Sequence, residues 1–278
     1  MSMEFGEIGA GVPWSMDEIP YGELDRVAVG EDTLLFHIVA SASFVEITSD
    51  LYTRNLIEYF RGDDEVVDWL ANHWEPEELQ HGASLKRYVQ IAWPAFDWES
   101  AYRSFLVEYA HFCKLEQLAP TRALEMAARC VVETGTATFY RTLSDAAPEP
   151  VLREITAKIS ADEVRHYKNF YHFFRKYRDS ERPGRTSVLR TLWGRAMEVD
   201  AEDAYVAFKH VYLATHPDTE FQAADYAAFR EGFRRLAKPY FPYEMAMKML
   251  LQPLGLAPAL RRVVLPPVTS ATRMLLFR

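Results

Sequence analysis

The sequence has few of the residues that build disulfide frameworks, turn-rich β folds or membrane spans. Its 278 residues include two cysteines, Cys113 and Cys130, and they do not form a C-x-x-C pair, which argues against a disulfide scaffold, a zinc ribbon or a rubredoxin-type centre. Glycine is also scarce, with 12 residues, and this favours helices over a turn-rich β fold. Because the sequence has neither an apolar run of about 18 residues nor a basic, apolar leader, we expect a cytoplasmic protein without a transmembrane segment.

Acidic residues outnumber basic ones overall, but this balance is reversed in the last 45 residues. The formal net charge is −9, which argues against a nucleic-acid partner. Residues 234–278 contain eight Lys or Arg residues and one acidic residue, Glu244, so this segment carries +7 and residues 1–233 carry −16. Two interpretations of this basic segment stay open: a solvated tail or dimer contact that uses its apolar residues, and a contact for an anionic membrane surface or an acidic carrier protein.

Apolar positions recur at helical spacing, and no alternating pattern typical of strands persists, so we predict an all-α protein. We expect an irregular lead over residues 1–30, a helical bundle over 31–178, and additional C-terminal helices packed on that bundle over 179–278. Six prolines between Pro239 and Pro267 predict an irregular C-terminal part. The expected helices span 31–60, 63–92, 98–117, 121–143, 150–177, 187–198, 201–215 and 222–238.

Three E-x-x-H strings occur in the predicted helices, at Glu78/His81, Glu108/His111 and Glu163/His166. A single string of this kind arises by chance, but residues three apart share one helix face and can turn toward one metal ion. A di-iron site in a four-helix bundle takes one Glu from each of two helices and a Glu-x-x-His from each of the other two. The chain supplies this set in the order Glu46, Glu78/His81, Glu133 and Glu163/His166.

The spacing of these residues indicates two copies of one helical hairpin. Glu46 and Glu133 are 87 residues apart, while Glu78 and Glu163, like His81 and His166, are 85 apart. Residues 93–119 are long enough to cross the bundle between the hairpins, as this fold requires. Glu108 and His111 fall in that crossover, and we therefore predict that they are not ligands. A lone Glu in an apolar helical stretch, such as Glu46 or Glu133, is costly to bury unless it is paired or bound to metal.

At these residues the chain resembles the ferritin-like superfamily of di-iron carboxylate proteins, and most closely the soluble acyl-carrier-protein desaturases. Trp74-Glu-Pro-Glu-Glu78-Leu-Gln-His81-Gly82 matches the family's W-x-x-E-E-x-x-H-G string, and Ala161-Asp162-Glu163-Val-Arg165-His166 matches its A-D-E-x-R-H string. Pro76 departs from the usual composition of a helix interior and predicts a kink. The matching part covers roughly residues 40 to 178, about half of the chain.

The resemblance implies a ferritin-like four-helix bundle with a long crossover connection, and two iron ions held by six ligands, with Mn/Fe as the alternative metal pair. The ligands would be Glu46, Glu78, His81, Glu133, Glu163 and His166. Asp162 would orient a ligand histidine, His81, and the Thr136 hydroxyl would lie near the oxygen-binding face.

From this site we predict a non-heme di-iron oxidase or oxygenase that uses dioxygen to desaturate or hydroxylate an apolar substrate, either small or bound to a carrier protein. It would need an external electron donor, and we expect a homodimer. Two alternatives stay open: a ferroxidase or iron-storage protein, and a rubrerythrin-like peroxidase. The roughly 100 residues after Tyr177 favour the oxygenase over storage proteins, which consist of little more than the bundle.

Overall fold

In the computed structural model, residues 12–112, 118–198 and 203–277 are described, and they form helices and turns without any strand. The all-α prediction is therefore confirmed for this part of the chain. The start of the predicted lead (residues 1–11), Cys113, the end of the predicted crossover helix and Arg278 lie outside it. The described lead contains the 3-10 turns Met16–Glu18 and Tyr21–Glu23 and the short helix α1 (Arg26–Val29).

The first predicted hairpin is present, but both of its helices are interrupted. The helix predicted over 31–60 is divided into α2 (Thr33–Glu46) and α3 (Ser49–Tyr59), with the interruption directly after Glu46. The returning arm consists of α4 (Asp64–Trp69), a π-helical turn over Leu70–Trp74, and α5 (Glu75–Ala92). We predicted a kink at Pro76, because proline has no backbone N–H to donate within a helix. The structure has a π turn just before Pro76 instead.

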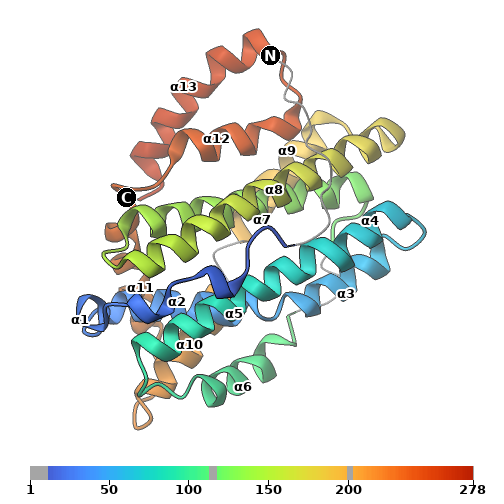
Figure 1. The fold of residues 1–278 in the computed structure, drawn as a ribbon. Coiled ribbons are helices and arrows are strands. Elements are labelled where there is room, and N and C mark those ends of the chain that lie inside the picture. The colour runs from blue at the N-terminus through green and yellow to red at the C-terminus, as the bar shows by residue number, and fades with distance from the viewer. Residues whose placement is uncertain (1–11, 113–117, 199–202, 278) are drawn as a thin grey trace.

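The second hairpin consists of two uninterrupted helices, α7 (Arg122–Ala146) and α8 (Pro150–Glu181). Thr121 caps α7 by accepting a hydrogen bond from the backbone N–H of Leu124. Glu149 caps α8 by accepting from the N–H groups of Val151 and Leu152. Helix α5 of the first hairpin packs against α8 of the second, and the long arms of both hairpins run side by side in Figure 1.

Further helices cover the outside of the hairpins. Helix α6 (Trp98–Tyr109) lies in the predicted crossover, and α10 (Asp203–Thr215) packs on both α6 and α2. Helix α9 (Arg185–Glu198) packs on α7, as does α12 (Tyr243–Leu251), while α11 (Ala223–Ala237) contacts α2 and α7.

The C-terminal part is more regular than its prolines predict. After the 3-10 turn Gln252–Leu254, residues Pro258–Leu275 form an 18-residue helix, α13, with Pro266 and Pro267 inside it. The prediction of an irregular segment was therefore wrong. Pro258 stands at the start of α13, where its missing N–H costs nothing, and both internal prolines lie on the exposed side of the helix.

Within the described residues, one segment, Thr33–Tyr59, is long and apolar enough to cross a membrane, with a mean hydropathy of 1.4. Of its most apolar window, 61% is buried inside the protein. Core helices of soluble proteins have the same character, so this segment is weak evidence for a membrane span.

Candidate metal centre

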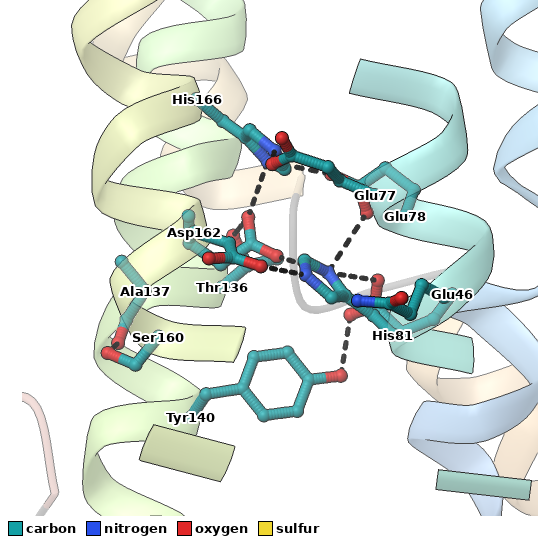
Figure 2. A network of polar contacts seen from close by, with 12 residues as sticks. Glu46, Glu77, Glu78, His81, Thr136, Ala137, Tyr140, Ser160, Asp162 and His166 are labelled. Atoms are coloured by element: carbon teal, nitrogen blue, oxygen red, sulfur yellow. Dashed lines mark hydrogen bonds and ion pairs between the residues drawn. The ribbon is translucent and has the colours of Figure 1, made fainter. Parts of the chain in front are cut away.

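All six predicted ligands lie together between the two hairpins, and all six are buried. Figure 2 shows side chains from α5 and α8 pointing toward one another, with Glu46 and Thr136 beside them. Glu46 is the last residue of α2, and Glu133 lies in the middle of α7. The two E-x-x-H strings lie on α5 and α8, the helices that join the hairpins at this point.

The side chains form two overlapping groups that could each hold a metal ion. One group contains Glu46 and His81, and the other contains Glu133 and His166; Glu78 and Glu163 belong to both. The ligand atoms of each group lie within 4.8 Å of one another. This arrangement has two histidine-bearing ends and a shared pair of carboxylates in the middle.

The distances around the histidines follow this division. His81 Nδ1 lies 3.2 Å from Glu163 Oε1 and 3.9 Å from a carboxylate oxygen of both Glu46 and Glu78. His166 Nδ1 lies 3.0 Å from Glu78 Oε1 and 3.6 Å from an oxygen of both Glu133 and Glu163. Each shared carboxylate therefore approaches both imidazoles.

The outer nitrogen of each histidine bonds to a carboxylate from the opposite hairpin. His81 Nε2 is 3.0 Å from Asp162 Oδ2, as the resemblance implies. His166 Nε2 is 2.8 Å from Glu77 Oε2, a partner that the sequence analysis missed. The repeat contained the signal, because Glu77 and Asp162 are 85 residues apart and each precedes a shared Glu. Such outer carboxylates fix the ring orientation and the tautomer of a metal-binding histidine.

Arg165 and Trp14 hold these outer carboxylates. The Arg165 guanidinium donates to Asp162 Oδ1 at 2.6 Å and to Glu77 Oε2 at 2.7 Å, so one side chain bridges both carboxylates. The Trp14 indole N–H donates to Asp162 Oδ2 at 2.7 Å, and its ring stacks on that of His81. The lead, which carried no site residue in the sequence analysis, thus covers the His81 end of the centre.

Two hydroxyl groups reach the inner carboxylates. Thr136 Oγ1 donates to Glu163 Oε2 at 2.8 Å, which places the predicted hydroxyl at a shared carboxylate. Tyr140 Oη donates to Glu46 Oε1 at 2.5 Å from a fully buried position. Tyr140 lies seven residues after Glu133, two helical turns along α7, and helical spacing alone does not predict its contact with the other hairpin.

A close approach of two backbones places Glu46 beside His81. A Cβ atom added to Gly82 would lie 2.6 Å from Ile47 Cα and nearer still to Ile47 N, so only glycine fits there. Ile47 is the first residue of the interruption between α2 and α3. The glycine that follows His81 therefore brings α5 against the end of α2, where Glu46 lies.

Burial and mutual repulsion disfavour charge on most of the inner carboxylates. Burial, followed by the neighbouring Glu163, raises the pKa of Glu133 to about 8 and raises the pKa values of Glu46 and Glu78. Burial also acts to raise the pKa of Glu163, but the neighbouring imidazoles of His166 and His81 hold it well below its usual range. Burial alone would lower the pKa of His81, but the hydrogen bond to Asp162 and the nearby Glu163 carboxylate raise it to about 10.

Unpaired polar atoms show that the residues present fit metal ions. The buried atoms His81 Nδ1, His166 Nδ1, Glu133 Oε2 and Glu163 Oε1 have no hydrogen-bond partner. Buried polar atoms in proteins are nearly always satisfied, so four in one cluster call for an explanation. All four face the shared interior, and carboxylate oxygens with imidazole nitrogens are ligands for iron and similar cations. Cations between these groups would satisfy all four atoms.

The third E-x-x-H string lies apart from this cluster. Glu108 on α6 accepts hydrogen bonds from Lys209 Nζ at 2.8 Å and is 2.9 Å from His210 Nε2, both on α10. His111 is exposed, beyond the end of α6. Among the described residues, the groups that could hold a metal ion do not include Glu108 or His111.

Comparisons with protein-family models, with curated proteins and with solved structures find no match to this chain. The resemblance to di-iron carboxylate proteins accordingly rests on the motifs and on the buried cluster of carboxylates and histidines.

Proposed function

We propose that the protein is a non-heme di-iron oxidase or oxygenase with a ferritin-like four-helix bundle, which uses dioxygen to desaturate or hydroxylate an apolar organic substrate. One observation carries the proposal: two buried Glu/His groups share Glu78 and Glu163, and both histidines direct an unpaired Nδ1 into the shared interior. Four carboxylates and two imidazoles arranged in this way match the donor set that would hold two ions in a di-iron carboxylate protein.

The chain's own residues would hold each ion and keep the site dry. Glu46 and His81 would bind one iron, Glu133 and His166 the other, and Glu78 and Glu163 would contribute to both. Bound iron would supply the electrons and the Lewis acidity for dioxygen reduction. Asp162 and Glu77 would keep the two imidazoles in the binding tautomer, while burial of all six ligands excludes bulk water.

Two hydroxyls would control the orientation of the carboxylates. Thr136 donates to the shared Glu163, and Tyr140 donates to the terminal Glu46, so each restricts the rotation of its partner. A hydroxyl that bonds to an inner carboxylate can also pass a proton to it as its charge changes. We therefore assign Thr136 and Tyr140 a role in positioning carboxylates and protons.

An apolar environment beside the cluster supports an apolar substrate. The buried indoles of Trp69 and Trp74 lie with their ring centroids 6.4 and 6.5 Å from that of His166, and both also contact Phe170. Removal of a hydrogen pair from the substrate supplies fewer electrons than full reduction of dioxygen requires. An external electron donor is therefore part of the proposal.

Anaerobic loading with Fe(II), followed by oxygen exposure and sizing of the product, separates this proposal from iron storage. We expect two irons per chain, a change in the absorption spectrum on oxygen exposure, and no mineral core. Hundreds of irons per particle in a hollow shell would show a storage protein instead. Failure to bind iron at all would overturn the assignment of the centre.

A further inference from the structure

Helix α13 is the most exposed long helix among the described residues. None of its 18 residues is buried, and it packs on α12 rather than on the hairpins. In Figure 1 it lies at the edge of the molecule, separated from α7 and α8 by α12. At 1.5 Å per residue the helix is about 27 Å long, so it presents an extended surface.

The inner side of α13 is fixed to the protein by specific contacts. The Arg261 guanidinium donates to the Gln252 side chain, and Thr272 Oγ1 donates to Met247 Sδ at 3.3 Å. Phe277, just after the helix, packs edge-on against Phe241 and Tyr243. These contacts hold α13 in place and determine which side faces outward.

The outer side is apolar along the whole helix. Leu260 is 49% exposed, Val263 70% and Met274 62%, although burial of such side chains is favourable. The other exposed residues on this side are mostly apolar as well: Ala259, Pro266, Pro267, Ala271 and Leu275. Contiguous apolar surface of this kind marks an interaction site.

Positive charge accompanies this apolar side. No acidic residue occurs from residue 245 to the end of the sequence, and Arg262 and Arg273 are exposed on α13 itself. Arginine side chains beside an apolar stripe can extend to lipid phosphates while the stripe enters the acyl boundary. Residues 1–233 carry a net charge of −16, so this end of the chain differs in sign from the rest.

We propose that α13 docks the protein on an anionic lipid membrane, lying parallel to the surface with Leu260, Val263 and Met274 inserted. A second copy fits this surface less well, because a symmetric contact would place the arginines of both copies opposite one another. An acidic carrier protein would pair with the arginines but would leave most of the apolar stripe in water.

The test measures co-sedimentation of the full chain with phosphatidylcholine vesicles, with and without phosphatidylglycerol. We expect binding to the anionic vesicles that weakens as salt rises, since exposed charges are screened over about 10 Å at 0.1 M. Val263→Glu should weaken the partition at least roughly tenfold, because burial of a valine contributes about 1.5 kcal/mol or more. Val107→Glu is the matched control, since Val107 is 73% exposed on α6 and should leave the partition unchanged.

The contribution of charge is tested in the same way. Arg262→Glu should weaken the partition at least roughly fivefold, since one basic residue near an anionic surface contributes about 1 kcal/mol. Arg175→Glu, at an exposed position on α8, makes the same change in net charge and should have little effect.

Three results would overturn the proposal: no partition into anionic vesicles, equal effects of the α13 and control variants, or binding to an acidic carrier protein in place of vesicles. Concentration-dependent dimerisation that Val263→Glu abolishes, without vesicle binding, would instead assign α13 to self-association. Each measurement reads vesicle partition or association state rather than activity, so its outcome is independent of that of the metal centre.

Discussion

The two hairpins contribute matching sets of buried Glu and His side chains on helices of different regularity. In the second hairpin, α7 and α8 run for 25 and 32 residues without a break. In the first, the chain breaks directly after Glu46, and a π turn ends four residues before Glu78. The ligand spacing of 85 to 87 residues nevertheless persists between the hairpins. The chemistry of the centre therefore depends on where a few side chains lie rather than on the regularity of the helices.

The residues after the two histidines show how each hairpin is supported. Gly82 allows α5 to touch the backbone of α2 at Ile47. Its counterpart 85 residues later is Tyr167, whose hydroxyl donates to Met249 O on α12 at 2.6 Å. One hairpin is thus closed by contact between its own arms, and the other is supported by a C-terminal helix.

Removal of a ligand from either hairpin should have the largest effect on metal content. Glu133→Ala and His81→Ala should each lower the metal bound per chain by about half or more while the protein stays helical, because each removes a donor from one of the two groups. Metal analysis and circular dichroism measure this. Glu108→Ala and His111→Ala are the controls and should retain full metal content. Full occupancy in Glu133→Ala would refute the ligand assignment.

Enlargement of Gly82 should break the first hairpin selectively. Gly82→Ala should lower the free energy of unfolding by about 2 kcal/mol, because its Cβ would overlap the backbone at Ile47. Gly194→Ala, in helix α9 with open space around it, should instead raise stability by about 1 kcal/mol. Denaturant unfolding compares the two variants. Equal changes in the free energy of unfolding for the two variants would show that the close approach of α5 and α2 does not require glycine at position 82.

Removal of charge from the two outer carboxylates tests whether the hairpins are equivalent. Asp162→Asn and Glu77→Gln should each weaken metal binding by about 10-fold to 100-fold, since each residue orients one histidine. Competition with a metal chelator gives the affinities. If Asp162→Asn weakens metal binding and Glu77→Gln does not, the two ends of the centre differ in chemistry although their geometry matches.

Arg165→Gln should weaken metal binding less than the loss of either outer carboxylate. Arg165 bonds to both outer carboxylates but contacts neither histidine, and its side chain is partly exposed, so we expect a loss of metal affinity of only about severalfold.

At the corresponding position in the first hairpin, 85 residues earlier, Gln80 donates to Trp14 O. Gln80→Ala should therefore loosen the lead, measured by hydrogen exchange at Trp14, with little loss of metal. The reverse ranking of the two variants would contradict these roles.

The sequence predicted that the six Glu and His side chains would gather, because helical spacing and the 85-residue repeat restrict which side chains can meet. Contacts between the hairpins, such as the hydrogen bond from Tyr140 to Glu46, depend on how closely the helices of the two hairpins pack. The spacing of residues along the sequence does not predict that distance. The interruption after Glu46 was missed for the same reason, since the backbone contact between Gly82 and Ile47 is a tertiary feature. Proline was a misleading signal in α13. Pro266 and Pro267 leave the carbonyls of Arg262 and Val263 without an intrahelical donor, but both of these residues are exposed to water.

Diffraction from metal-loaded crystals, recorded at the iron absorption edge, tests the central claim most directly. The account predicts two anomalous peaks between Glu78 and Glu163, one beside His81 and Glu46 and the other beside His166 and Glu133. A single peak, no peak in this interior, or a peak at Glu108 and His210 would contradict it.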